Sequence, residues 1–153
     1  MAIKFRRSTA ADGQCAMRIW KRAVDATHDF LSEQDRHDIE QELEGFLPNA
    51  PLWLAVDCQD RALGFMLLTG SHMDALFVDP DCRSTGVGRA LVEHGLSLCP
   101  ALTTDVNEQN AQAVGFYERM GFQRAGRSPT DDQGRPYPLI HLRYVSRECG
   151  SNG

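Results

Sequence analysis

The sequence lacks any apolar stretch long enough to cross a membrane, and its first residues, MAIKFRRSTAADG, lack the apolar core of a secretory signal. It also has no C-x-x-C pair and no cysteine–histidine pair at the spacing of zinc ligands. Its five cysteines are odd in number and scattered, at Cys15, Cys58, Cys82, Cys99 and Cys149. We therefore expect a cytoplasmic protein with free thiols and without a metal site.

The chain also has fewer positive than negative side chains. It contains 16 lysines and arginines and 21 aspartates and glutamates, so its formal net charge is -5. Nucleic acids and membrane surfaces are anionic and would repel such a chain as a whole. We expect neither as a partner, so any anion that binds must be captured at a local site.

Internal repeats, low-complexity runs and long linkers are missing too. The 153 residues are enough for one domain, which at this size buries roughly 68–70% of its unfolded surface. A hydrophobic content of 42% and a charged content of 24% are typical of a globular protein. We expect a single domain over residues 1–147 and a flexible tail over residues 148–153.

Strand and helix patterns alternate along the chain. Ser32 begins a helix that has acidic residues in its first turn, Asn107 can cap another helix, and Gly121 ends it. The predicted strands are residues 2–7, 52–57, 62–70, 72–78, 101–106, 122–128 and 137–145. The predicted helices run from Ser8 or Thr9 to about Ala26, from Ser32 to near Gly45, between Gly86 and Pro100, and over 108–120. This order predicts a three-layer α/β or α+β domain.

Apolar residues at helical spacing predict the buried face of the first helix, which carries Ala16, Ile19, Trp20 and Ala23. We expect this face in the core. The other aromatic side chains expected there are Phe30, Phe46 and Trp53.

The stretch 82-CRSTGVGRALVEHG-95 places Gly86 and Gly88 at the start of a predicted helix. A helix start offers about four free N–H groups and a partial positive charge, which together bind anions. Glycine lets the backbone approach a ligand where a Cβ would collide, and Arg83 and Arg89 add positive charge. The two glycines alone leave two interpretations open, a phosphate loop or a tight helix start.

Two common phosphate loops do not fit these residues. A P-loop requires G-x-x-x-x-G-K-S/T, and no lysine follows Gly88. A dinucleotide fingerprint has Gly86-x-Gly88 and an acidic Asp105 in its favour, but Leu91 occupies the third glycine position. Residues 79–85 also separate the strand from Gly86, so a nicotinamide-dependent oxidoreductase is disfavoured.

A better match is the pattern Q/R-x-x-G-x-G/A, present as Arg83-Ser84-Thr85-Gly86-Val87-Gly88. This run resembles the pyrophosphate loop of the GCN5-related N-acetyltransferases (GNATs). Two longer stretches carry the same resemblance, DALFVDPDCRSTGVGRALVEHG and NEQNAQAVGFYERMGF, the second with N-x-x-A-x-x-F/L-Y-x-x-x-G-F spacing. The stretches VDATHDFLS, HMDALFVDP and GRPYPLI resemble small bacterial members of the family. The order of elements agrees, so the resemblance covers nearly the whole chain.

The resemblance implies an α/β (α+β) fold with a mixed, mostly antiparallel sheet of about seven strands, splayed between the fourth and fifth, and about four helices. It implies an N-acetyltransferase that moves the acetyl group of acetyl-CoA, its cosubstrate, to a primary amine of a small molecule or a protein. The amine would attack directly in a ternary complex, without a metal. A module that binds acyl-CoA without catalysis is the alternative, and a monomer and a homodimer both fit.

In the family, the strand before the loop hydrogen-bonds the pantetheine arm through its backbone, and residues 76–78 occupy that place here. The arm satisfies backbone groups that are exposed where this strand splays from its neighbour, residues 101–106. A backbone N–H near Val78 would donate to the thioester oxygen as negative charge develops. The implied coenzyme-binding residues are Leu76, Phe77, Val78, Arg83, Ser84, Thr85, Gly86, Val87, Gly88, Arg89, Ala90, Asn107, Asn110, Ala113, Phe116 and Tyr117.

Tyr117 is the implied general acid, because the family's tyrosine at this place protonates the departing CoA thiolate. With an unperturbed pKa of about 10, a phenol keeps its proton at neutral pH. Position alone favours a half-buried packing residue instead, since Tyr117 shares a helical face with Ala113, Val114 and Met120.

His72 occupies the place where family members often carry a glutamate as the base. An imidazole has an unperturbed pKa of about 6.5 and can accept a proton at physiological pH. The replacement of glutamate by histidine leaves a second interpretation open, a histidine at a strand end without a catalytic role.

The resemblance places the acceptor beside the junction of the first two helices, where Asp25, His28 and Asp29 lie. Acidic groups there would attract a cationic amine, although a solvated turn between helices explains the same residues. Cys82 lies close to the glycine loop and could carry an acetyl group, but no activating base stands beside it in the sequence, so loop packing is favoured.

Overall fold

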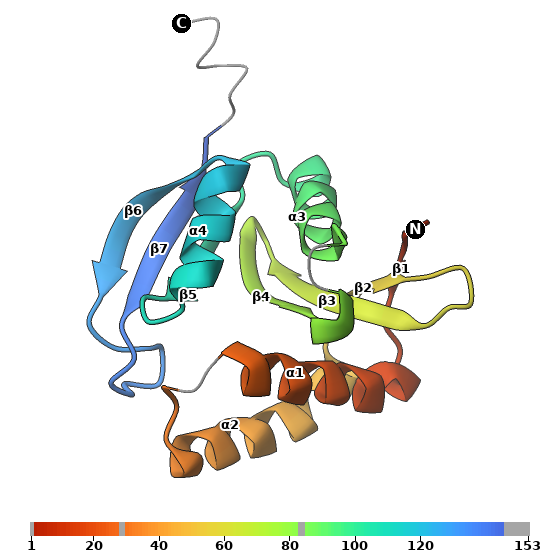
Figure 1. Ribbon diagram of the computed structural model, residues 1–153, viewed down its shortest axis with the longest axis horizontal. Coiled ribbons are helices and arrows are strands. Elements are labelled where there is room, and N and C mark those ends of the chain that lie inside the picture. The colour runs from red at the N-terminus through yellow and green to blue at the C-terminus, as the bar shows by residue number, and fades with distance from the viewer. Residues whose placement is uncertain (1, 28–29, 83–84, 146–153) are drawn as a thin grey trace, which may run out of the picture. The chain divides into compact units, whose positions relative to one another are not determined.

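The computed structural model describes residues 2–27, 30–82 and 85–145 (Figure 1). The chain divides into two compact units, Met1–Leu68 with Ala75–Glu93 and Thr69–Asp74 with His94–Gly153. Within the described ranges, no helix combines the length and the apolar character that crossing a membrane requires. The expectation of one domain over residues 1–147 stays a prediction, and the tail 148–153 lies outside the described residues.

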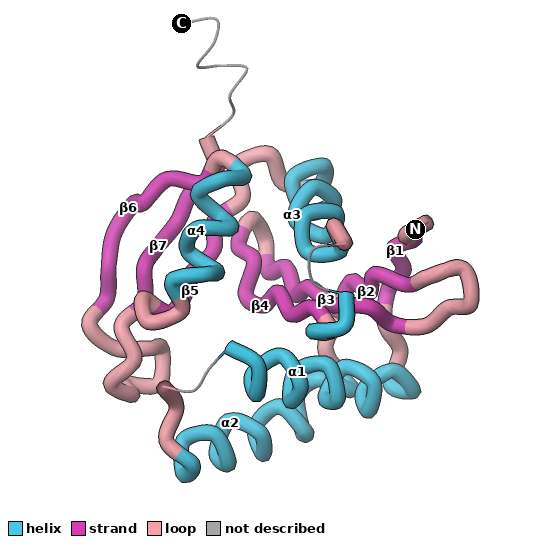
Figure 2. The backbone as a smooth tube through the Cα atoms, viewed as in Figure 1, coloured by secondary structure: helices cyan, strands magenta, loops and turns pink. Residues whose placement is uncertain are grey.

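The first unit combines two helices with an antiparallel ladder. Lys4 lies opposite Val56 and Trp53 opposite Met66, and a polar turn joins the second and third strands (Figure 2). This pairing confirms the predicted hairpin of residues 52–70. The elements of this unit, complete or in part, are β1 (Lys4–Arg7), α1 (Gly13–Thr27), α2 (Glu33–Phe46), β2 (Trp53–Val56), β3 (Ala62–Thr69), β4 (His72–Val78) and α3 (Val87–Leu98).

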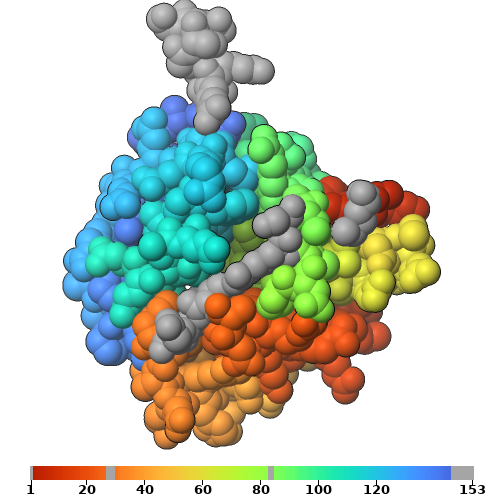
Figure 3. Space-filling model, viewed as in Figure 1, coloured from red at the N-terminus to blue at the C-terminus, as the bar shows by residue number. Residues whose placement is uncertain are grey.

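One face of α1 packs against the strands of this unit. Ala16, Ile19 and Trp20 are at most 3% exposed and share a hydrophobic cluster with Leu54 and Phe65. The buried face predicted from apolar spacing is therefore confirmed. Figures 1 and 3 show α1 and α2 running side by side.

The predicted core position of Phe46 is wrong, because its side chain is 50% exposed. The chain passes from α2 into a short 3-10 turn at this point, and the next residue, Leu47, takes the buried position with 3% exposure. Phe30 and Trp53 are half-buried.

The second unit is built on three antiparallel strands and the start of β4. Strand β7 (Leu139–Tyr144) lies between β5 (Thr103–Asn107) and β6 (Phe122–Ser128). β4 joins in parallel, with His72 opposite Thr103 and Met73 opposite Thr104. Helix α4 (Ala111–Met120) packs against β5 and β6 (Figure 1).

The described strands form a seven-stranded sheet in the order β1-β2-β3-β4-β5-β7-β6, in which β4 and β5 pair in parallel, whereas β1–β2, β2–β3, β5–β7 and β6–β7 are antiparallel. Together with four α-helices, this confirms the predicted mixed, mostly antiparallel sheet. Residues 72–78 and 122–128 form strands with the predicted bounds. The splay that the resemblance implies between β4 and β5 stays a prediction.

Helix caps agree with the sequence at two places and differ at one. Ser32 caps α2 by accepting the Asp35 N–H at 3.1 Å, and Gly121 ends α4 with a φ of 112°. The cap of α4 is Asn110, whose Oδ1 accepts an N–H at 3.2 Å, and not Asn107 as predicted. Asn107 instead pairs with β7 and so remains in β5.

Gly64 in β3 lies against the backbone of β4, and a Cβ there would lie 2.9 Å from the Phe77 carbonyl oxygen and 3.3 Å from Val78 Cα. We expect Gly64→Ala to lower the free energy of unfolding by about 1–3 kcal/mol, because the strand backbones must move apart. The control is Gly45→Ala in α2, where a Cβ meets nothing within 4 Å. Alanine should stabilise that helix by about 0.5–1 kcal/mol. Urea unfolding followed by circular dichroism measures both, and a Gly64→Ala protein as stable as the wild type would contradict the close approach.

Candidate functional site

The predicted glycine loop leads into the first turn of α3. Gly86 has a φ of 90°, a left-handed conformation that favours glycine. The N–H of Ala90 donates to the Gly86 carbonyl at 2.9 Å and so begins the helical hydrogen-bond ladder. The N–H groups of residues 86–89 precede that ladder, and groups in this position are the ones that bind an anion at a helix start.

The other predicted loop residues differ in exposure. Val87 is fully buried and anchors the loop, while Gly88 and Ala90 are half-buried and Thr85 is exposed. The Arg89 side chain is 70% exposed, 3.5 Å from a Glu93 carboxylate oxygen one turn further along α3. Arg83 and Ser84, two of the predicted coenzyme-binding residues, lie outside the described residues.

A buried carboxylate anchors the chain just before this loop. Asp79 is 7% exposed, accepts the Asp81 N–H at 3.0 Å and accepts a hydrogen bond from Arg22 of α1 at 2.9 Å. The same guanidinium donates to the Asp81 carboxylate at 2.9 Å. The hydrogen bond to Asp81 and the charge of Asp79 raise the pKa of Arg22 above its ordinary value. The turn that leads into the loop is thereby tied to α1.

Cys82 lies between this anchor and the loop. Burial, followed by the charges of Asp79 and Asp81, raises the pKa of the thiol above its ordinary value. A thiol with a raised pKa is a poor nucleophile near neutral pH, because the thiolate is the reactive form. The environment of Cys82 therefore agrees with the prediction that it does not carry an acetyl group.

Of the three residues predicted to bind the acceptor, the structure describes Asp25. It is exposed on α1 and forms an ion pair with Arg36 of α2. This pairing offsets the negative charge that was expected to attract an amine. His28 and Asp29 lie outside the described residues.

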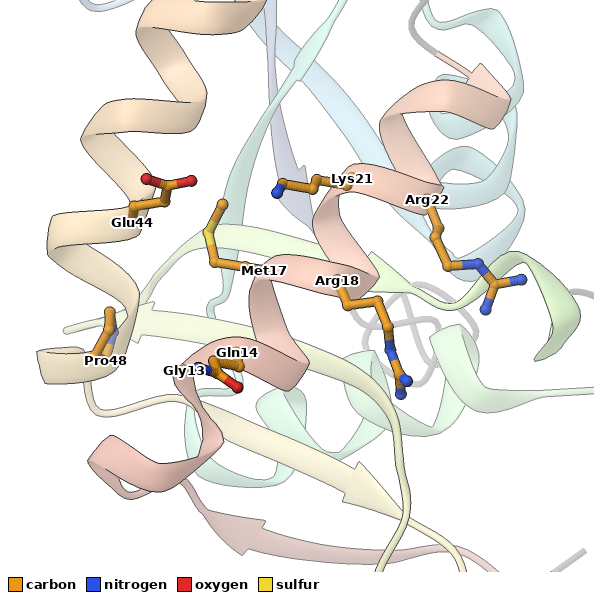
Figure 4. A pocket seen from close by; sticks show the side chains of 8 residues that line it. All are labelled: Gly13, Gln14, Met17, Arg18, Lys21, Arg22, Glu44 and Pro48. Atoms are coloured by element: carbon orange, nitrogen blue, oxygen red, sulfur yellow. The ribbon is translucent and has the colours of Figure 1, made fainter.

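A hollow of about 520 Å³ lies on the first unit between α1 and α2 (Figure 4). Lys21 and Glu44 point toward one another across Met17, whereas Arg18 and Arg22 point away from α2. The described residues that line it include none of the predicted coenzyme-binding or catalytic residues.

Tyr117 of α4 is buried in the second unit, with 7% of its surface exposed. Its ring makes edge contacts with Phe116 and Phe122 at centroid distances of 5.2 and 5.4 Å. The Thr104 hydroxyl, which donates to the Met73 carbonyl at 2.9 Å, interacts with that of Tyr117 and lowers its pKa, but by less than burial raises it. Burial raises the pKa of Tyr117, so the phenol keeps its proton.

The remaining predicted coenzyme contacts are distributed over both units. In the second unit, Asn107 ends β5, Asn110 caps α4, and Ala113 and Phe116 are half-buried on that helix. In the first unit, Leu76, Phe77 and Val78 are half-buried at the end of β4.

His72 lies at the start of β4 among polar groups of the second unit. Its Nδ1 is 2.7 Å from Thr103 Oγ1, and its Nε2 is 3.4 Å from Asp105 Oδ2 and 3.8 Å from Asp74 Oδ1. The His72 side chain is 33% exposed. One ring nitrogen therefore lies beside two carboxylates at a place that solvent reaches.

The polar row continues from Asp105 across the sheet. Asp105 Oδ1 is 2.6 Å from His141 Nδ1, and His141 Nε2 is 2.6 Å from Ser128 Oγ. The row thus crosses β4, β5, β7 and β6 within the second unit. Sequence reasoning did not find these partners of His72. Strand alternation could have put Thr103 and Asp105 on one face, but only the position of β7 between β5 and β6 brings in His141.

Each unit by itself carries groups with a chemical capacity, the first unit one such group and the second unit two. The start of α3 can bind an anion, Tyr117 can donate a proton, and His72 can accept one. Among the residues in the described ranges, no group of three or more histidine, cysteine, aspartate or glutamate side chains is arranged to hold a metal ion.

Comparison with known proteins gives concordant matches. Residues 19–137 match the acetyltransferase (GNAT) domain family. The chain is 60% identical over 144 residues to the peptidyl-lysine N-acetyltransferase YjaB of Salmonella typhimurium (strain LT2), covering 94% of this chain and 99% of the relative. It is 59% identical over 145 residues to the peptidyl-lysine N-acetyltransferase YjaB of Escherichia coli (strain K12), covering 95% and 99%. The solution structure of apo-form YjaB from Escherichia coli is similar with a TM-score of 0.92 at 59% identity, over 95% of this chain and 99% of that one.

We expect Cys82 to react with iodoacetamide at least about tenfold more slowly than Cys58 near neutral pH, because burial disfavours its thiolate. Cys58 is exposed and serves as the internal reference. Peptide mass spectrometry after timed labelling measures both rates. In guanidinium the two thiols should react alike. Equal rates in the folded protein would make Cys82 a candidate acetyl carrier again.

Proposed function

Because the chain belongs to the acetyltransferase (GNAT) domain family, we propose that this N-acetyltransferase moves the acetyl group of acetyl-CoA to the ε-amine of lysine residues in proteins. The observation that carries the choice of lysine is the 60% identity to a relative of matching length that is named for this acceptor. A module that binds acyl-CoA without catalysis is not supported. The two relatives that align with this chain over 99% of their own length are both named as enzymes. The free thiols of the described residues agree with a cytoplasmic setting.

The coenzyme's diphosphate binds at the start of α3. Gly86, with its φ of 90°, lets the chain turn so that the N–H groups of residues 86–89 face the phosphates. Arg89 adds a mobile positive charge near the mouth of this site. The ion pairs of Arg22 with Asp79 and Asp81 support the turn from which the loop leaves. The backbone of residues 76–78 binds the pantetheine arm, and the Val78 N–H donates to the thioester oxygen.

The reaction is a direct attack in a ternary complex. The lysine ammonium loses a proton to His72, directly or through a water, and the neutral nitrogen forms a bond to the thioester carbon. The carbonyl oxygen carries negative charge in the tetrahedral intermediate, which then breaks its carbon–sulfur bond. The CoA thiolate leaves and takes the hydroxyl proton of Tyr117, while the attacking nitrogen gives up its second proton as the amide forms, and this proton restores the Tyr117 hydroxyl through solvent. The raised pKa of Cys82 supports this route over an acetyl-cysteine intermediate.

Incubation with acetyl-CoA and a peptide that has a blocked N-terminus and a single internal lysine tests the proposal. We expect release of CoA thiol together with one acetyl group on the lysine, located by mass spectrometry. A peptide with arginine in place of lysine is the matched control. Gly86→Val serves as a binding control, because a β-branched residue disfavours the positive φ of this position. Thiol release with polyamines but not with the lysine peptide would make a small amine the acceptor.

We expect Tyr117→Phe to lower kcat by about 10²–10⁴-fold, the usual contribution of a positioned acid, with little change in the affinity for acetyl-CoA. Calorimetry measures the affinity and a thiol-release assay measures kcat. The variant removes one oxygen from a ring that packs against Phe116 and Phe122, so the aromatic contacts remain. Equal turnover of the variant and the wild type would remove Tyr117 from the acid role.

A further inference from the structure

The polar row across β4, β5, β7 and β6 has a part in the reaction beyond proton acceptance by His72. We propose that Asp105, held in place by His141, is the positioning residue that orients His72 and pairs with its imidazolium as the amine is deprotonated. This inference rests on the proposed acetyl transfer with His72 as the base.

The hydrogen bonds of Thr103 determine which ring nitrogen of His72 is free. Thr103 Oγ1 lies 3.5 Å from the Ser71 carbonyl, to which it donates, and 2.7 Å from His72 Nδ1. With the single Thr103 hydrogen directed to Ser71, we assign His72 Nδ1–H as the donor to Thr103. The neutral imidazole therefore keeps its lone pair on Nε2, the nitrogen that lies 3.4 Å from Asp105 Oδ2.

A lone pair that faces a carboxylate with no hydrogen between them is unfavourable, whereas a proton on Nε2 turns the contact into an ion pair. Proton transfer from the lysine ammonium to His72 creates that ion pair without any movement of the protein. Asp105 then pairs with the charge of the imidazolium at the ring nitrogen that takes the proton, whereas the carboxylate of a catalytic triad binds the opposite ring nitrogen.

Asp105 faces His72 because its other oxygen is bound from the opposite side. His141 lies directly across from Asp105 in the β5–β7 register, and its Nδ1–H donates to Asp105 Oδ1 at 2.6 Å. The Ser128 hydroxyl donates to His141 Nε2 at 2.6 Å, so both ring nitrogens of neutral His141 have partners. The β-sheet thus supports the carboxylate through two further strands.

The other charged groups near this row do not substitute for Asp105. Asp74 on β4 lies 3.8 Å from His72 and accepts a hydrogen bond from Thr69. Arg143 on β7 lies opposite Thr103 and is exposed. Arg127 on β6 lies opposite Ile140, on the other face of the sheet, and is paired with Glu108 at 2.5 Å. Asp74 is the only other carboxylate among these described groups that faces His72, and its greater distance makes Asp74→Asn a matched control.

The test compares Asp105→Asn with Asp74→Asn in the dependence of kcat on pH at saturating acetyl-CoA and lysine peptide. We expect Asp105→Asn to lower kcat by about 10-fold to 100-fold, as for the loss of a charged hydrogen bond, and to leave the KM for acetyl-CoA unchanged. Asp74→Asn should change kcat by less than about threefold.

Two His141 variants separate positioning from packing. His141→Leu removes the hydrogen bond to Asp105 and should lower kcat by about the same 10-fold to 100-fold. His141→Asn presents an amide N–H near the place of Nδ1–H and should keep kcat within about threefold of the wild type. Circular dichroism checks folding, and if His141→Leu does not fold, the nearly isosteric Asp105→Asn decides the question.

The outcomes distinguish this inference from the proposed function. A folded wild type that releases no thiol with acetyl-CoA and the lysine peptide overturns the proposed function. If the wild type is active, and Asp105→Asn and His141→Leu have the same kcat as the wild type, the positioning role alone is overturned. Equal losses in His141→Leu and His141→Asn would also overturn it, since the restored N–H would then have no effect. Nitrogen chemical shifts of the imidazoles give an independent readout, and we expect Nδ1–H tautomers at His72 and His141.

Discussion

The parallel contact between the start of β4 and β5 is the constraint on which the chemistry of the second unit depends. It places His72 opposite Thr103 and Met73 opposite Thr104. Side chains alternate along a strand, so successive positions serve opposite faces of the sheet. His72 meets Thr103 on one face, while on the other face Thr104 donates to the Met73 carbonyl and interacts with Tyr117. A shift of one residue in this register would exchange the two faces and separate the proposed base from Asp105.

Burial gives Tyr117 its proton and also limits how the proton can leave. Because burial raises the pKa of Tyr117, a tyrosinate is unfavourable at this place. In the proposed acid role, the proton is therefore best transferred late, when the carbon–sulfur bond is largely broken and the thiolate carries its full charge.

Local patterns predicted most of the fold and only part of the site. The bounds of β4 and β6, the cap at Ser32 and the stop at Gly121 depend on neighbouring residues, which a sequence displays directly. The cap at Asn110 was missed because pairing with β7, a distant segment, keeps Asn107 in its strand. The carboxylate partner of His72 was missed for the same reason. Asp105 and His141 are separated by 36 residues, and only the sheet order makes them neighbours.

Net charge explains why the loop of the first unit depends on Arg22. The chain carries a formal charge of -5, and Asp79 and Asp81 stand immediately before the proposed diphosphate site. Unpaired, these carboxylates would repel the phosphates at short range. The guanidinium of Arg22 binds both at 2.9 Å, which neutralises part of their charge and fixes the turn in the same contact. Anion binding at the start of α3 therefore depends on α1 as well as on the glycines of the loop, because backbone N–H groups attract a phosphate only where nearby negative charge is offset.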